Sequence, residues 1–201
     1  MLELLAPAGN LDAVIAAVQN GADAVYMGFG DGFNARRSAD NFTRESFAKA
    51  VRYCHIRGCK VYVTLNTLVG DREMDAAAAL AQQASDAGAD AILVQDLGLA
   101  RVLRAALPDI PLHASTQMTI LSGDEAELYR NYGVTRFVPA RECTIEEIRA
   151  MRAQTDLEIE VFVHGALCYC YSGQCLMSEE IGDRSGNRGM LSLIHISEPT
   201  R

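Results

Sequence analysis

The residues of this chain that are best suited to chemistry lie close together after residue 163. An apolar, β-branched run at 158–163 is followed by His164, and three cysteines then stand at positions 168, 170 and 175. An imidazole can act as acid, base or metal ligand, and thiolates are ligands of zinc and of iron–sulfur clusters. The same residues also fit reduced, partly buried thiols beside a core histidine, because Cys-x-Cys-x4-Cys matches no common zinc pattern.

The composition is that of an ordinary globular protein. The 201 residues suffice for one sizeable domain, and 49% of them are hydrophobic and 22% charged. A net charge of -8 argues against a broad nucleic-acid surface, although a local basic patch would still allow an RNA substrate. The sequence shows neither an apolar run long enough to span a bilayer nor a secretory signal. With six cysteines, it therefore predicts a cytoplasmic protein with reduced thiols and no membrane contact.

Short apolar strands alternate with helices along the chain. Predicted helices begin at capping residues such as Thr43 and Thr144 and end at glycines such as Gly21 and Gly88. The predicted strands lie at 2–6, 24–28, 60–65, 91–95, 112–115, 136–140 and 158–163. This alternation requires a parallel sheet, which is compatible with an open doubly wound sheet or a barrel. Seven units favour an incomplete TIM-barrel-like (β/α) fold, one unit short of eight and with one open edge.

A barrel would gather the polar residues that follow its strands, because the carboxyl ends of the strands form the active-site face. Candidate residues at these ends are Asn66, Gln95, Asp96, Ser115, Gln117, Arg141, Glu142 and His164. We expect the side chains of Gln117, Arg141, Glu142 and His164 to share one mouth. Asp96 is better interpreted as a helix cap, and Glu142 next to Arg141 also fits a structural ion pair.

The stretch EVFVHGALCYCYSGQCLMS at 160–178 resembles the signature of the collagenase-like peptidase family U thirty-two. The segments HASTQ at 113–117 and ARE at 140–142 also resemble motifs of this family. The signature positions are matched by Glu160, Phe162, His164, Gly165, Ala166, Cys168, Tyr171, Ser172, Gly173, Cys175 and Ser178. Cys170 stands where the family usually has a small residue, and no role is predicted for it.

The resemblance implies a barrel-like domain and oxygen-independent hydroxylation of ribosomal RNA, transfer RNA or a quinone precursor. The motifs HASTQ and SGQC are most similar to those of the ribosomal RNA branch. It also implies a [4Fe–4S] cluster on four cysteines, with Cys168 and Cys175 as the first two ligands. A homologous partner subunit is a further possibility. The candidate catalytic residues are His113, Gln117, Arg141, Glu142, Glu160 and His164.

Two other functions stay open on residue chemistry alone, namely a peptidase and a non-catalytic partner subunit. Cys168 with His164 is the only local thiol–imidazole pair, and neither a Gly-x-Ser-x-Gly elbow nor a His-Glu-x-x-His helix is present. The last residues, LSLIHISEPTR, continue no strand or helix pattern. We therefore expect a truncated family domain at 1–190, with further cluster ligands beyond it, and a poorly packed artefactual tail at 191–201. The activity of such a fragment stays open.

Overall fold

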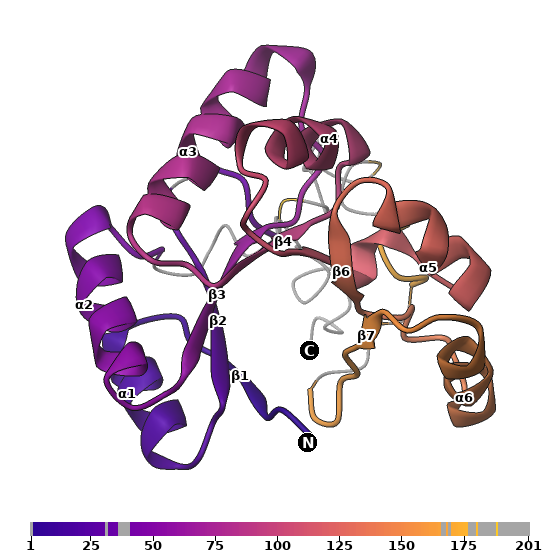
Figure 1. Ribbon diagram of the computed structural model, residues 1–201, viewed down its shortest axis with the longest axis horizontal. Helices are drawn as coiled ribbons and strands as arrows, with labels where there is room; N and C mark the ends of the chain where they lie inside the picture. The colour runs from indigo at the N-terminus through magenta and orange to yellow at the C-terminus, as the bar shows by residue number, and fades with distance from the viewer. Residues whose placement is uncertain are drawn as a thin grey trace, which may run out of the picture.

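The computed structural model describes residues 2–30, 32–35, 41–165, 168, 170–176, 180 and 188. Seven strands in this part of the chain form one sheet, and Figure 1 shows the sheet curled with its helices on the outer side. The strands are β1 Leu5–Pro7, β2 Ala24–Gly28, β3 Lys60–Leu65, β4 Ala91–Val94, β5 Leu112–Ala114, β6 Val134–Phe137 and β7 Glu158–Ile159. The helices are α1 Leu11–Gln19, α2 Arg44–His55, α3 Met74–Asp86, α4 Leu97–Ala106, α5 Gly123–Arg130 and α6 Ile145–Gln154, with 3-10 turns η1 Asp71–Glu73 and η2 Thr116–Met118.

The strand order confirms the predicted architecture. Each strand pairs in parallel with the next one along the chain, from β1 to β7. Among the described strands β1 and β7 do not pair with each other, so the curled sheet keeps the open edge expected for an incomplete barrel. The predicted tail at 191–201 lies outside the described residues.

Several predicted strand boundaries were wrong, most clearly that of the last strand. Residues 158–163 were predicted to be a strand, whereas β7 ends at Ile159 and the Glu160 amide makes one further bond to the Phe137 carbonyl. Pro139 lies just beyond the end of β6 and has no N–H to donate, and among the described strands β7 has no second neighbour. The strand-like run Val161-Phe162-Val163 is therefore left unpaired and exposed.

Helix starts follow the expected capping chemistry. Thr43 and Thr144 each accept a hydrogen bond from the amide three residues later, and Glu147 completes a capping box with Thr144. The Asp96 side chain accepts from the Leu99 amide, which confirms its interpretation as a cap of α4. These caps satisfy amides that the first helical turn leaves without a partner.

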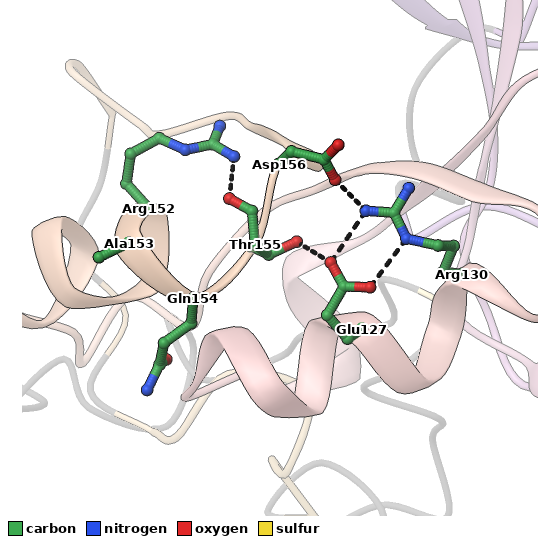
Figure 2. Close-up of a pocket in the computed structure, with 7 residues that line it drawn as sticks. All are labelled: Glu127, Arg130, Arg152, Ala153, Gln154, Thr155 and Asp156. Carbon is green, nitrogen blue, oxygen red and sulfur yellow. Dashed lines mark hydrogen bonds and ion pairs between the residues drawn. The ribbon is translucent and has the colours of Figure 1, made fainter.

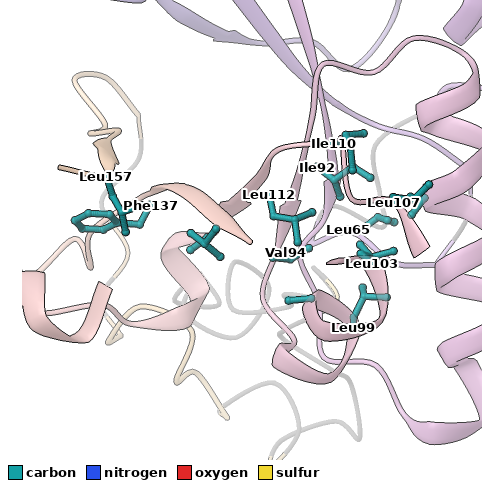
Figure 3. Close-up of a cluster of buried hydrophobic side chains, with 14 of the residues drawn as sticks. Leu65, Ile92, Val94, Leu99, Leu103, Leu107, Ile110, Leu112, Phe137 and Leu157 are labelled. Carbon is teal, nitrogen blue, oxygen red and sulfur yellow. The ribbon is translucent and has the colours of Figure 1, made fainter. Parts of the chain in front are cut away.

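The apolar core lies between the sheet and the outer helices. Figure 3 shows a cluster in which Leu65, Ile92 and Leu112 of the strands pack with Leu99 and Leu103 of α4, all almost fully buried. Burial of each such side chain stabilises the fold by about 1.5–3 kcal/mol. Because alternate strand residues face this layer, their neighbours face the inside of the curled sheet.

The inside of the sheet carries a charged network near the amino ends of the strands. Arg136 of β6 donates to Glu3 Oε1 at 2.6 Å and to Glu158 Oε2 of β7 at 2.7 Å. Glu3 also accepts from the Tyr62 hydroxyl at 2.9 Å. Although partial burial of Glu3 opposes the shift, its hydrogen bonds with Arg136, Tyr62 and Lys60 lower its pKa to about 2. This network bridges the two unpaired edges of the sheet.

Candidate functional site

A cavity of about 170 Å³, lined by both polar and apolar groups, opens at the carboxyl ends of the strands. Residues that line it include Tyr26, Asn34, Asn66, Ser115, Thr116 and Glu160. They come from several strands and from the loops that follow them. The cavity therefore occupies the face on which barrel enzymes place their active sites.

The amide side chains around the cavity hold one another in place. Asn34 Nδ2 donates to Asn41 Oδ1 at 2.8 Å. Asn66 accepts from the Ala35 amide at 3.2 Å and donates to Ser115 Oγ at 3.3 Å. A wall held by such bonds is ordered before any ligand arrives, which lowers the entropic cost of binding.

Gly28 allows these amides to approach the end of β2. A Cβ at this position would lie 2.7 Å from Asn34 Nδ2, which is closer than real Cβ contacts. A larger residue here would therefore displace the amides from the cavity wall.

Glu160 is the only ionisable side chain other than Tyr26 among the described residues that line this cavity. Its Oε2 atom is buried and has no hydrogen-bond partner among the described residues, and its nearest charge is Arg136 Nη1 at 3.6 Å. Burial raises the pKa of this carboxyl, although the Arg136 guanidinium opposes the shift. Glu160 was predicted as a catalytic candidate, and its place in the cavity is compatible with that role, which stays a prediction.

The segment that carries the cysteines is fastened to the strand ends through Ser172, which is fully buried. Ser172 Oγ accepts from the Arg141 amide at 3.0 Å and from Arg141 Nε at 3.1 Å. The Ser172 amide donates to Glu142 Oε1 at 2.9 Å, and its carbonyl accepts from Thr119 Oγ1 at 2.6 Å. Arg141 and Glu142 thus both hold the cysteine loop, defined here as residues 168 and 170–176.

Gly173 brings the cysteine loop into direct contact with Gln117. Its backbone has a φ of +71°, and a Cβ at this position would lie 2.7 Å from the Gln117 carbonyl carbon. Only glycine adopts this conformation at low cost and also leaves room for the Gln117 backbone. Gln117 therefore meets the loop through its carbonyl group, which also accepts from Gln95 Nε2 at 3.2 Å.

The three thiols of the cysteine loop lie near one another. Cys168 is exposed, whereas Cys170 and Cys175 are partly buried. The contact with Cys175 raises the pKa of the Cys170 thiol, with a smaller contribution from Cys168, and the Arg141 charge opposes the shift. Cys170, for which no role was predicted, thus contacts a predicted ligand. Among the described residues, no group of three or more His, Cys, Asp and Glu side chains is arranged to hold a metal ion.

The two predicted histidines occupy different environments. His164 is exposed, and no hydrogen bond or ion pair within the described chain joins it to Arg141 or Glu142. His113 is 3% exposed and packs edge-on against the Tyr62 ring inside the sheet. Burial, aided by the Arg136 charge, lowers the pKa of His113 to about 3, so this imidazole is neutral near pH 7. The roles predicted for both residues stay predictions.

The remaining cysteines lie outside the cysteine loop. Cys54 and Cys59 contact each other at the amino end of β3, and burial raises the pKa of Cys54 to about 12. Cys143 is partly buried, and its thiol lies 3.9 Å from the Ile120 carbonyl oxygen.

A second surface site, shown in Figure 2, lies at the opposite end of the fold, before β7. Glu127 of α5 pairs with Arg130 at 2.8 Å and also contacts Thr155, while Arg130 contacts Asp156. The hydrogen bonds from Arg130 and Thr155 lower the pKa of Glu127 to about 2. These mutually satisfied groups join α5 to the turn after α6, and we interpret them as structural.

Sequence reasoning missed the loop contact that organises the site. Ser172 was matched to the family signature but received no role. Its partners Arg141 and Glu142 were predicted to point into the active-site opening at the strand ends, whereas they bind the cysteine loop through Ser172. The cavity amides Asn34 and Asn41 were also missed. The Gly-rich sequence around them was a possible signal, because glycine often marks close approach of other groups to the backbone.

Comparison with known proteins supports the family resemblance. The sequence profile described as Peptidase family U32 matches residues 9–191. The chain is 44% identical over 188 residues to the 23S rRNA 5-hydroxycytidine C2501 synthase of Escherichia coli, covering 94% of this chain and 28% of that protein. It is 40% identical to tRNA hydroxylation protein P1 of Bacillus subtilis, covering 93% of this chain and 44% of that protein.

A more distant relative has a different kind of name. The chain is 32% identical to a protein named Collagenase from Porphyromonas gingivalis, covering 96% of this chain and 48% of that protein. The chain thus spans less than half the length of each of these three relatives.

The fold is also found in solved structures. The structure of the U32 peptidase Mk0906 matches with a TM-score of 0.66 at 16% identity, covering 80% of this chain and 68% of that one. The crystal structure of DHDPS from Cyanidioschyzon merolae with lysine bound matches with a TM-score of 0.52 at 13% identity, covering 79% of this chain and 63% of that one. At such identities these matches show the fold alone.

Proposed function

The chain belongs to peptidase family U32, and on that premise we propose that it acts in the oxygen-independent hydroxylation of RNA as part of an iron–sulfur enzyme. The proposal draws on relatives named for 23S rRNA and tRNA hydroxylation, at 44% and 40% identity. Its main structural support is the cysteine loop, which Arg141 and Glu142 hold beside the cavity at the strand ends. An RNA substrate places the proposed reaction in the cytoplasm.

The cysteine loop carries thiols, the donor type that an iron–sulfur cluster requires, although the described residues alone do not form a metal site. Clusters are held by thiolates, and thiolates brought together without a cation repel one another. The raised pKa of Cys170 beside Cys175 is a sign of this proximity. In the proposed enzyme Cys168 and Cys175 hold the cluster, which would supply electron transfer when bound, and further ligands come from outside the described residues.

The surrounding residues would orient the loop rather than react. Arg141 and Glu142 fix Ser172 through its backbone and its hydroxyl, and Gly173 rests on the Gln117 backbone. Arg141 also places a positive charge near Cys170, which favours the thiolate form that metal binding needs. No helix in the described part of the chain is long and apolar enough to cross a membrane.

The cofactor proposal is tested by iron and acid-labile sulfide analysis of anaerobically purified protein. Cys168→Ala and Cys175→Ala should each lower the iron content, whereas Cys59→Ala, at the other end of β3, should not. Equal iron in all four proteins would remove the cluster from the proposal.

The reaction is tested by deleting the gene in its own host and measuring hydroxylated nucleosides in ribosomal and transfer RNA by mass spectrometry. Loss of one such nucleoside, restored by the wild-type gene, is the expected result. Unchanged RNA together with cleavage of peptides such as gelatin by the purified protein would favour a peptidase. Unchanged RNA with no cleavage would favour a partner subunit or a reaction on a quinone precursor.

A further inference from the structure

We propose that Cys170 and Cys175 form a reversible disulfide when the cysteine loop meets hydrogen peroxide, and that this bond withdraws Cys175 from metal binding. The inference rests on the iron–sulfur enzyme proposed above and adds to it a redox control of the same loop. It gives a role to Cys170, the thiol for which none was predicted. The turn between the two cysteines, the contact of their thiols and their exposure support it.

A tight turn places the two cysteines opposite each other. The Gln174 amide donates to the Tyr171 carbonyl at 3.1 Å and closes a β-turn. Gly173, the third residue of this turn, has a φ of +71°, as turns of type II require at that position. Cys170 and Cys175 stand directly before and after the turn. Facing residues of paired chain segments have Cα atoms about 4.5–5.5 Å apart, a separation that a disulfide spans.

The two thiols also meet each other. The Cys170 thiol is in hydrogen-bond contact with Cys175, whereas Cys168 contributes a smaller interaction through its charge. Sulfur atoms within hydrogen-bond reach need only small side-chain rotations to approach the S–S bond length of about 2.05 Å. Cys175 is therefore better placed than Cys168 to bond with Cys170.

The turn is held in place before any bond forms. Ser172 is fully buried, and its Oγ accepts from the Arg141 amide at 3.0 Å. Its own amide donates to Glu142 Oε1 at 2.9 Å, and Gly173 rests on the Gln117 backbone. Because the folded chain already brings the two cysteines together, closing the disulfide costs little further loop entropy.

Exposure distinguishes this pair from the other thiol pair of the fold. Cys54 and Cys59 have the same sequence separation and also contact each other, but they are only 0% and 2% exposed. Cys170 and Cys175 are partly buried and keep part of their surface open. A small oxidant therefore reaches the loop pair, whereas the core encloses the pair before β3. The two pairs form a matched comparison within one chain.

The reaction takes two electrons from the thiols. The Cys175 thiolate attacks one oxygen of hydrogen peroxide, the O–O bond breaks, and the leaving hydroxide takes up a proton to become water. The Cys170 thiolate then attacks the resulting sulfenic sulfur, which forms the S–S bond and releases a second hydroxide as water. Two thiols are thus oxidised to one disulfide, and the peroxide is reduced to two waters. Since thiolates are the metal ligands, Cys175 holds no iron until a thiol reductant restores it.

The test is peroxide oxidation of the metal-free 201-residue chain, followed by alkylation in denaturant, trypsin digestion and mass spectrometry. All three loop cysteines fall in the peptide 153–184, because it contains no internal lysine or arginine. We expect this peptide to become lighter by two hydrogens before alkylation, with only Cys168 alkylated and a 170–175 link located by fragmentation. A thiol reductant should restore three alkylated cysteines, and Cys54 and Cys59 should stay reduced throughout.

The variant Cys170→Ser separates a disulfide from simple oxidation of one thiol. Without its partner, the sulfenic acid of Cys175 should pass on to sulfinic acid, which a thiol reductant does not reverse. The fraction of Cys175 recovered by the reductant should therefore fall by about tenfold relative to the wild type. Cys54→Ser, in the enclosed pair, is the matched control and should oxidise and recover like the wild type.

Four results would overturn the proposal. They are no 170–175 disulfide in the oxidised wild type, a link from Cys168 in its place, equal recovery of Cys175 in wild type and Cys170→Ser, and equally fast oxidation of Cys54 and Cys59. Because the assay uses metal-free protein and no RNA, its failure is distinct from a failure of RNA hydroxylation. Iron that depends on Cys175 while no disulfide forms would leave the cluster standing and remove the redox control.

Discussion

Replacing Gly173 by alanine should release the cysteine loop from the strand ends without unfolding the domain. The new Cβ would lie 2.7 Å from the Gln117 carbonyl carbon and 2.9 Å from Gln117 Cα. Ordinary carbon contacts begin near about 3.5 Å, so the loop must move outward by about 1 Å or more. A movement of that size breaks hydrogen bonds, because their lengths tolerate only a few tenths of an ångström.

The magnitude follows from the contacts that would be lost. Ser172 bonds to the charged Arg141 side chain and to the Glu142 carboxylate, and hydrogen bonds to charged groups contribute about 1.5–3 kcal/mol each. Its bond from the Arg141 backbone amide joins neutral groups and contributes about 0.5–1.5 kcal/mol. A left-handed backbone adds about 1–2 kcal/mol for alanine over glycine. The lost hydrogen bonds of Ser172 and the backbone strain of alanine together exceed a docking energy of a few kcal/mol. We therefore expect the loop to undock.

Thiol labelling measures this undocking. Cys170 and Cys175 should react with a maleimide at least about tenfold faster in Gly173→Ala than in the wild type, since about 1.4 kcal/mol of lost docking energy corresponds to tenfold. Gly21→Ala is the matched control: its φ is +88°, but nothing lies within 4 Å of the added Cβ. It should lower the melting temperature slightly and leave the labelling rates unchanged. Equal labelling rates in Gly173→Ala and wild type would refute the proposed docking.

Two further predictions concern the inside of the sheet. Arg136→Met should lower the free energy of unfolding in urea by about 1.5–3 kcal/mol, because it removes the charged hydrogen bonds to Glu3 and Glu158 and leaves the partly buried Glu3 with Lys60 as its cation. Arg149→Met, in an exposed pair, should have almost no effect, and equal effects would contradict the role of the network. His113→Phe should make stability less sensitive to acid. The folded pKa of His113 is about 3 and its unfolded value about 6.5, so the unfolded wild type takes up a proton as the pH falls below about 6.5. Wild-type stability should therefore decrease by up to about 1.4 kcal/mol per pH unit more than that of the variant, and parallel pH curves from urea titrations would contradict this.

The fold was largely predictable from the sequence because its signals are local. Strand runs such as 60–65 and caps such as Thr43 and Thr144 depend on residues a few positions apart, and all were found where expected. The last strand failed for a non-local reason. Its sequence favours a strand through Val163, but among the described strands β7 pairs only with β6, which ends at Phe137 just before Pro139.

The site was predictable only in part because its contacts join distant segments. Arg141 and Glu142 were found through a motif. Their partner Ser172 lies about 30 residues away, and no pattern near these residues in the sequence predicts the contact. The bond between Arg136 and Glu3 spans 133 residues, so neither residue was singled out. Sequence patterns thus named several residues of the site, whereas their partners required the folded chain.

The most direct test of the proposed function compares RNA from cells that carry the wild-type gene with RNA from cells that carry Cys175→Ala or Cys59→Ala. Cys175 lies in the cysteine loop, whereas Cys59 is buried at the other end of β3. The measurement is the amount of hydroxylated pyrimidine nucleoside in total RNA, determined by mass spectrometry. We predict that Cys175→Ala abolishes this nucleoside while Cys59→Ala preserves it. Wild-type amounts of the nucleoside in Cys175→Ala cells would contradict the assignment of the cysteine loop to RNA hydroxylation.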